Sequence, residues 1–60
     1  MNLPADDNIL LSLVNTKLRD KYASLADFCD GEEVEEEELC ARLAASGYRY
    51  DPSRNAFLSK

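Results

Sequence analysis

The sequence predicts a mainly α-helical fold: a three-helix bundle of winged helix-turn-helix-like arrangement with a small C-terminal β-hairpin. Three observations predict it. Apolar residues recur at helical spacing in three segments, and each segment carries its own start and stop signals. The last segment changes to the alternation of short strands around a turn. At 60 residues the chain has the length of one small domain, so we expect residues 1–60 to fold as a unit with a marginal core.

The first helix is predicted over residues 6–21. Asp6 can cap it, and Lys17, Arg19 and Lys21 place positive charge near the C-terminal end of its dipole. One apolar arc faces the core; it consists of Leu10, Leu11, Val14, Leu18 and Tyr22. Ile9 and Leu13 fall outside this arc. This helix therefore has more apolar surface than one face can use, and we expect the C-terminal segment or another chain to cover the surplus.

The second helix is predicted over residues 24–30. Ser24 with Asp27 three residues later is a weaker relative of the capping box. Three apolar residues then share a face: Leu25, Phe28 and Cys29. Gly31 is expected to end the helix in the left-handed conformation. Two helical turns do not stand alone, so this helix must pack on its neighbours.

The third helix is predicted over residues 35–46, with Gly47 as its stop signal. Its first turn holds only acidic residues, which the helix dipole favours; they are Glu35, Glu36, Glu37 and Glu38. Glu38 is spaced to pair with Arg42. The predicted apolar face consists of Leu39, Cys40, Leu43 and Ala44.

The hairpin is predicted over residues 48–58. Tyr48, Arg49 and Tyr50 alternate in character, residues 51–55 have turn chemistry, and an extended pattern resumes around Phe57. A two-stranded ribbon is not stable alone in water. We therefore expect Tyr48, Tyr50 or Phe57 to pack on the helices.

Charge is segregated along the chain. The net charge is -5, but residues 30–38 hold seven acids and no base, whereas residues 39–60 hold four bases and one acid. In a winged helix-turn-helix domain the third helix would present its N-terminal residues to the major groove. Four glutamates there oppose phosphate contact, so we expect no DNA binding by this helix.

The hairpin offers another surface for nucleic acid. Arg49, Arg54 and Lys60 lie near Tyr48, Tyr50 and Phe57 in the sequence, which mixes basic with aromatic residues. The competing interpretation, which we favour, places the aromatic rings in the core and leaves the bases in solvent. Nucleic acid is therefore an unlikely partner.

Metal binding and catalysis find little support. Residues 27–38 have the length of an EF-hand loop, but Cys29, Gly31 and Glu32 occupy positions that need ligands or glycine. Cys29 and Cys40 match no zinc spacing and are predicted to be packed, reduced thiols. The chain has no histidine and no glycine-rich phosphate loop. We expect no enzyme activity, no cofactor, no metal and no small-molecule substrate.

The location is predicted to be cytoplasmic. No apolar run approaches the length of a membrane span, and the N-terminal residues carry acids where a secretory signal would carry bases. Two cysteines are too few for a disulfide-stapled secreted protein of this size.

Motifs along nearly the whole chain form a recognisable pattern. They are Leu3-Pro4-x-Asp6, Leu10-Leu11-Ser12-x-Val14-Asn15-x-x-Leu18-Arg19-Asp20-x-Tyr22-x-Ser24-Leu25, Leu43, Gly47-Tyr48-x-Tyr50-Asp51 and Asn55-x-Phe57. In these motifs the chain resembles the short bacterial proteins grouped as domain of unknown function 4250. The similarity is loose across residues 31–38, where this sequence is unusually acidic. The resemblance implies a stand-alone bacterial cytoplasmic protein and supplies no activity, cofactor or catalytic residue.

The leading functional hypothesis is a non-enzymatic protein-interaction module that binds a protein partner or a second copy of itself, with the biological process undefined. Its expected contact residues are Ile9, Leu13, Tyr48, Tyr50 and Phe57. The four glutamates at residues 35–38 would steer a basic partner. The alternative is a nucleic-acid-binding accessory that uses Arg49, Arg54 and Lys60 of the hairpin instead of the third helix.

Overall fold

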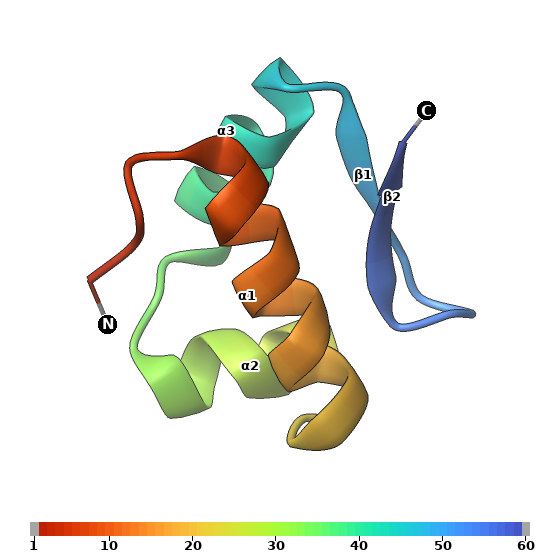
Figure 1. Cartoon of the computed structure of the whole chain (residues 1–60). Helices are drawn as coiled ribbons and strands as arrows, with labels where there is room; N and C mark the ends of the chain where they lie inside the picture. Colours follow the sequence, from red (N-terminus) through yellow and green to blue (C-terminus); the bar gives the residue numbers. More distant parts are fainter. Residues whose placement is uncertain (1, 60) are drawn as a thin grey trace.

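The computed structural model describes residues 2–59. Three helices, α1 (Asp7–Asp20), α2 (Leu25–Glu32) and α3 (Glu36–Ala45), precede a hairpin of β1 (Tyr48–Asp51) and β2 (Ala56–Ser59) (Figure 1). This order confirms the predicted mainly helical fold with a C-terminal antiparallel hairpin. β2 packs along α1 and β1 packs on α3, so the hairpin closes one side of the helical layer.

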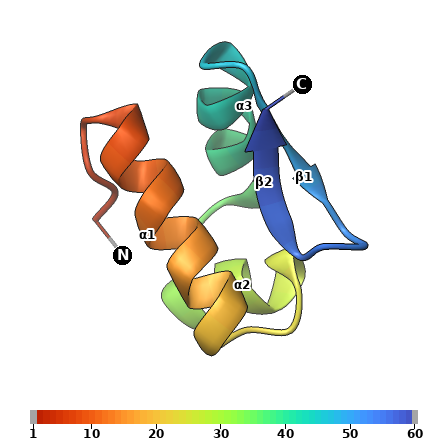
Figure 2. The ribbon, with the colours of Figure 1, turned by 45° about the vertical axis from the view of Figure 1, so that its right-hand side comes forward.

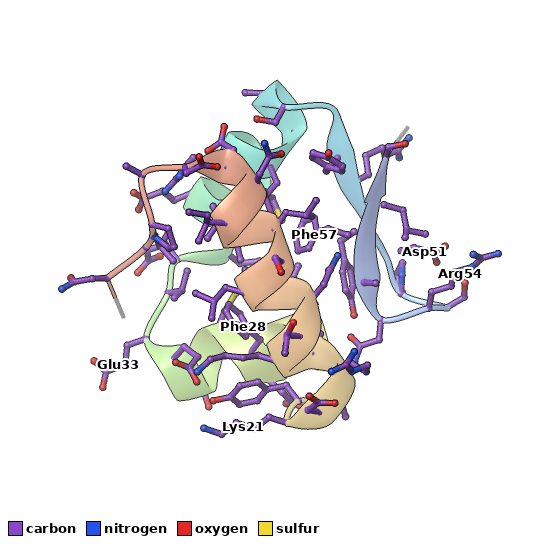
Figure 3. All side chains as sticks on the ribbon, viewed as in Figure 1. Lys21, Phe28, Glu33, Asp51, Arg54 and Phe57 are labelled. Atoms are coloured by element: carbon purple, nitrogen blue, oxygen red, sulfur yellow. The ribbon has the colours of Figure 1, made fainter. Side chains whose placement is uncertain are left out.

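The core lies where α1, α2, α3 and the inner face of the hairpin meet. Its buried side chains come from every helix and from β2: Leu10, Val14, Leu18, Leu25, Phe28, Cys29, Leu39, Leu43 and Phe57. Figure 3 shows Phe28 and Phe57 pointing into this interior. The apolar faces predicted for the first two helices are confirmed. On α3 the prediction was wrong for Ala44, which is exposed, because the core contacts of that helix come from Leu39 and Leu43.

Side-chain caps set the starts of the first two helices. Oδ1 of Asp6 accepts hydrogen bonds from the backbone N–H groups of Asn8 and Ile9, at 2.8 and 3.2 Å. Oγ of Ser24 accepts one from the N–H of Asp27, at 3.1 Å. Both caps satisfy amides that have no partner inside the helix. The cap residues predicted from the sequence are confirmed.

The end of α2 differs from the prediction. Gly31 lies inside the helix, and Glu33 takes the left-handed conformation with φ of 57°. The reason is the ring of Tyr22, which lies against Gly31; a Cβ there would be 2.7 Å from Cε1 of Tyr22. The glycine thus makes room for a tyrosine instead of ending the helix. The N–H of Val34 donates to the Cys29 carbonyl and closes the helix end.

A second difference concerns Arg42. Its guanidinium does not pair with Glu38; it reaches Asp7 at 2.9 Å and also donates to the carbonyls of Pro4 and Ala5. Ser46 donates to the other oxygen of the Asp7 carboxylate. This contact ties the start of α1 to the end of α3. Arg42 therefore pairs with a residue that tertiary packing brings close, and not with the one that helical spacing predicts.

Candidate functional site

An open groove lies between α1 and the hairpin. It has a volume of about 710 Å³. Residues of α1 form one wall, and residues at the end of the turn and the start of β2 form the other. Figure 2 shows how α1 and the hairpin are placed in the fold. The polar residues that line it are Asn8, Ser12, Asn15, Thr16, Arg19, Arg54 and Asn55, and the apolar ones are Leu11, Leu18 and Ala56.

Of the residues that the structure describes, two arginines and no acidic side chain line this groove, although the chain carries a net charge of -5. Arg19 extends from the last turn of α1 and holds Asp20 through two hydrogen bonds of 2.8 and 2.9 Å. Arg54 comes from the hairpin turn, and Figure 3 shows it at the outer tip of the molecule near Asp51. Arg19 was not predicted as a site residue, because Arg54, the other arginine of the groove, lies 35 residues further along the chain.

Two asparagines fasten the groove walls together. Oδ1 of Asn15 accepts from the N–H of Phe57 at 2.8 Å, and its Nδ2 donates to the carbonyl of the same residue at 3.0 Å. Nδ2 of Asn55 donates to the carbonyls of Leu18 and Tyr22, at 3.0 and 2.9 Å. We call Asn15 and Asn55 the amide clamp. It gives the groove a fixed width because both side chains bridge α1 and the hairpin.

Tyr50 extends the amide clamp to α2. Its hydroxyl donates to Oδ1 of Asn55 at 2.7 Å and accepts from the N–H of Leu25 at 3.2 Å. Its ring packs against Phe57 with centroids 5.5 Å apart. Tyr50 is therefore a structural residue at the junction of α2 and the hairpin, and its side chain is not free to meet a partner.

The bases of the hairpin do not converge on one surface. Arg49 lines a second hollow of about 340 Å³ on the outer face of the hairpin, with Leu58 and Asp51 among its neighbours. Arg54 lines the groove described above. Lys60 lies outside the described residues. Of the described predicted nucleic-acid contacts, only Arg54 lies in the large groove.

The acidic segment is exposed. The side chains of Glu35, Glu36, Glu37 and Glu38 all lie on the surface at the start of α3. Glu35 and Glu38 join Glu33 around a third hollow of about 350 Å³, where Arg42 is the one base among the lining residues that the structure describes. Negative charge is thus gathered at the junction of α2 and α3, away from the two arginines of the large groove.

The predicted apolar contact residues divide into three groups. Ile9 is 58% exposed, and within residues 2–59 it is one of two large apolar side chains on the surface, the other being Leu58. Leu13, Tyr48 and Tyr50 are half-buried, and both tyrosines pack against the core. Phe57 is only 2% exposed. Inward alternation on β2 places its ring in the core and not on the surface, and its role as a partner contact stays a prediction.

Both cysteines are poor nucleophiles. Cys29 is buried and Cys40 half-buried, and neither forms a disulfide. Burial raises the pKa of both thiols, and the nearby negative charge of Glu36 raises it further. A raised pKa leaves little thiolate at neutral pH. The two residues act as packing groups on the facing sides of α2 and α3.

Residues 27–32, which begin the EF-hand-like stretch, belong to helix α2 and so do not form a calcium loop. Within residues 2–59, no three acidic or cysteine side chains are grouped so that they could hold a metal ion. In the same range no helix is long and apolar enough to cross a membrane.

Comparison with known proteins identifies the family. The model of a domain of unknown function, DUF4250, matches residues 4–57, from the segment before α1 to the buried Phe57 of β2. No curated protein and no solved structure is significantly similar to the chain. The match spans all three helices and most of the hairpin, so the chain belongs to the DUF4250 family.

Proposed function

We propose that the protein is a non-enzymatic interaction module that binds another protein through the open flank of α1. The observation that carries this proposal is the exposure of Ile9. A large aliphatic side chain that is 58% exposed, with half-buried Leu13 one turn further along the same flank, leaves apolar surface in contact with water. Covering that surface with a partner is favourable at roughly 25 cal/mol per Å² of apolar area.

The state of the polar groups supports binding over catalysis. In the described residues no buried side-chain nitrogen or oxygen lacks a hydrogen-bond partner. The shifted carboxylates Asp7 and Glu32 owe their lowered pKa first to structural hydrogen bonds, from Ser46 and from Tyr22. Catalytic groups are usually poised in a cleft with a pKa near the working pH. These groups instead hold helices together.

The distribution of charge supports a basic partner. Four exposed glutamates at residues 35–38 form a block of negative charge, and exposed charge of one sign steers the approach of a partner of the opposite sign. The interaction should therefore weaken as salt is added, because exposed charges are screened over about 8 Å at physiological ionic strength.

Affinity capture with three baits tests the proposal. The baits are the wild-type protein, Ile9→Ser, and Ala45→Ser as a matched control on an exposed position of α3. We expect wild type and the control to retain one protein at low salt, and Ile9→Ser to lose most of it. Purified partner and titration calorimetry would then give the ratio of dissociation constants. Equal retention by all three baits, or binding that does not respond to salt, contradicts the proposal.

A second candidate function is supported by the groove between α1 and the hairpin. Arg19 and Arg54 line it without any acidic side chain, which favours a ligand carrying phosphate groups, as in a nucleic-acid-binding accessory. This candidate differs from the hairpin surface expected from the sequence, because Arg49 lies in another hollow.

A mobility-shift titration with mixed single-stranded RNA and DNA at low salt tests this candidate. We expect a shift for the wild-type protein that Arg19→Ala and Arg54→Ala each weaken, while Arg49→Ala leaves it unchanged. The absence of a shift, or equal weakening by all three substitutions, contradicts it.

A further inference from the structure

The two edges of the hairpin have different surroundings, because α1 bonds to the backbone of β2 and not to that of β1. In the register of the hairpin, Tyr50 lies opposite Phe57 and Arg49 lies opposite Leu58. Both backbone polar groups of Phe57 bond to Asn15 on α1, so they point away from β1. Antiparallel strands alternate between pairs that exchange hydrogen bonds and pairs that do not. Tyr50 and Phe57 are therefore a pair without hydrogen bonds between them.

It follows that β1 has an open edge. Because Tyr50 does not bond to Phe57, its backbone N–H and C=O point away from β2, and those of Tyr48 two residues earlier point the same way. Within residues 2–59 no protein group bonds to these four polar groups. Figure 2 shows β2 between α1 and β1, with β1 on the outer side. Asn15 thus occupies the edge of β2 and leaves the edge of β1 free.

An open strand edge is a template for one more strand. The side chains of β1 decide which strand fits. Tyr48 and Tyr50 pack inward against the core, so Arg49 and Asp51 project from the opposite face. Arg49 is exposed and makes no ion pair in the described residues. Asp51 accepts two hydrogen bonds from Ser53 through Oδ1, and its carboxylate also lies near Arg54.

The charges of Arg49 and Asp51 in one copy are complementary to those of Asp51 and Arg49 in a second copy. When an identical strand pairs antiparallel with β1 about a two-fold axis at Tyr50, Arg49 of each copy lies opposite Asp51 of the other. Facing residues of that kind have Cα atoms about 4.5 Å apart, close enough for two cross-strand ion pairs. A shift that centres the pairing on Arg49 would oppose two arginines. The charge pattern therefore selects one register.

We propose that β1 pairs with β1 of a second copy about a two-fold axis at Tyr50, which joins the two hairpins into one four-stranded antiparallel sheet. The backbone groups of Tyr50 in the two copies exchange two hydrogen bonds, and the N–H of each Tyr48 reaches the carbonyl of Pro52 in the other copy. The inference goes beyond the proposed function, because it uses the edge of β1 and not the flank of α1, and its one partner is a second copy of this chain.

Sedimentation equilibrium with charge-reversal variants tests the pairing. We expect the weight-average mass of the wild-type protein to rise with concentration from 6.7 kDa toward twice that value. Arg49→Asp and Asp51→Arg each place like charges opposite one another twice, so each variant alone should stay at 6.7 kDa. An equimolar mixture of the two variants restores both opposite-charge contacts and should again form dimers. Asp30→Arg, a charge reversal at an exposed position of α2, is the matched control and should behave as wild type.

Amide hydrogen exchange gives a second measurement that needs no substitution at Asp51, the last residue of β1. In the monomer the N–H of Tyr50 is unbonded, whereas that of Phe57 is held by Asn15. As the protein concentration is raised, exchange at Tyr48 and Tyr50 should slow at least tenfold, and exchange at Phe57 should change little. A mass of 6.7 kDa at every concentration, association of folded Arg49→Asp equal to wild type, or unchanged exchange at Tyr50 would overturn the inference.

Failure of this inference is distinct from failure of the proposed function. If the protein stays monomeric but Ile9→Ser still abolishes capture of a partner, the edge pairing is wrong and the α1 flank stands. If dimers form and respond to Arg49→Asp while Ile9→Ser has no effect on capture, the edge pairing stands and the flank is wrong.

Discussion

The hairpin and the helix ends are attached to the rest of the molecule by different chemistry. The hairpin is held by the amide clamp, in which neutral side chains bond to backbone groups of Phe57, Leu18 and Tyr22. The helix ends are held by carboxylates, with Asp7 receiving Arg42 and Ser46 and with Glu32 receiving Tyr22 and Lys17. We call Asp7 and Glu32 the carboxylate latches.

This difference shows how stability is divided. Removal of a neutral amide side chain leaves its half-buried backbone partners without a hydrogen bond at any pH, at a cost of about 1–3 kcal/mol for each group. A carboxylate near the surface responds to pH and salt, and its partners can turn to water. The amide clamp should therefore set the level of stability, whereas the carboxylate latches should set its dependence on pH.

The largest loss of stability is expected when Asn55 is substituted. Asn55→Ala removes its three hydrogen bonds, to Leu18, Tyr22 and Tyr50, and leaves alanine at φ of 51°. We expect a loss of about 3 kcal/mol in the free energy of unfolding, measured by urea denaturation. Asn55→Gly keeps the backbone conformation and should lose about 2 kcal/mol, because only the hydrogen bonds are removed. Equal stability of wild type and Asn55→Gly would show that the clamp contributes nothing.

Substitution of Asn15 should cause the second-largest loss of stability. Asn15→Ala leaves the N–H and C=O of Phe57 without their partner on α1, and we expect a loss of about 2 kcal/mol. The exchange of the Phe57 amide proton should become faster in the same variant. Ser12→Ala, on the groove face of α1 one turn earlier, is the control and should change stability by less than about 0.5 kcal/mol. Slow exchange at Phe57 in folded Asn15→Ala would contradict the clamp.

A smaller effect on stability is expected for substitution of Gly31, and its sign should depend on whether Tyr22 is present. A Cβ at this position would meet the ring of Tyr22 at 2.7 Å, so Gly31→Ala should displace the tyrosine from Glu32 and Phe28. We expect a net loss of about 1 kcal/mol despite the better helix propensity of alanine. In a Tyr22→Ala background the same substitution should stabilise α2 by up to about 1 kcal/mol. A loss of the same size in both backgrounds would show that Tyr22 is not the obstacle.

The smallest effect on stability at neutral pH is expected for substitution of the carboxylate latches. Hydrogen bonds from Tyr22 and Lys17 lower the pKa of Glu32, and those from Ser46 and Arg42 lower the pKa of Asp7. A pKa that is lower in the folded state contributes stability that is complete above the ordinary pKa and is lost as the pH falls through the folded value. Stability should therefore decline below about pH 4.5, the ordinary pKa of the glutamate, with Asp7 following from 3.8 downward.

Glu32→Gln and Asp7→Asn should flatten this acid decline in urea denaturation curves recorded at several pH values. Asn15→Ala should shift the whole curve of stability against pH downward without changing its slope. A slope that changes with Asn15→Ala, or that does not change with Glu32→Gln, would erase the distinction between the clamp and the latches.

Local patterns were enough to predict the elements of the fold. Apolar spacing gave the core contribution of Leu10, Val14 and Leu18, and cap residues gave the helix starts at Asp6 and Ser24. Local reasoning was wrong where a distant side chain intervened. Gly31 looked like a helix stop because its immediate neighbours do not show that Tyr22 needs the space, and Arg42 was expected to pair with Glu38 because Asp7 lies 35 residues away.

The candidate site could be predicted only in part. The exposure of Ile9 follows from its place outside the apolar arc of α1, and this was visible in the sequence. The placement of Arg19 and Arg54 in the same groove was not visible in the sequence, because it depends on how the hairpin docks on α1. The separation of Arg49 from Arg54 likewise depends on the hairpin twist and turn.

By itself the sequence determined three helices and a hairpin, the segregation of charge, and the apolar surplus on the first helix, because each of these depends on residues close together in the chain. Tertiary structure alone decided that Asn15 and Asn55 hold the hairpin, that the edge of β2 is covered, and that the edge of β1 is open. The physical reason is that an amide reveals its role only when its partners are known, and these partners lie 33 to 42 residues away.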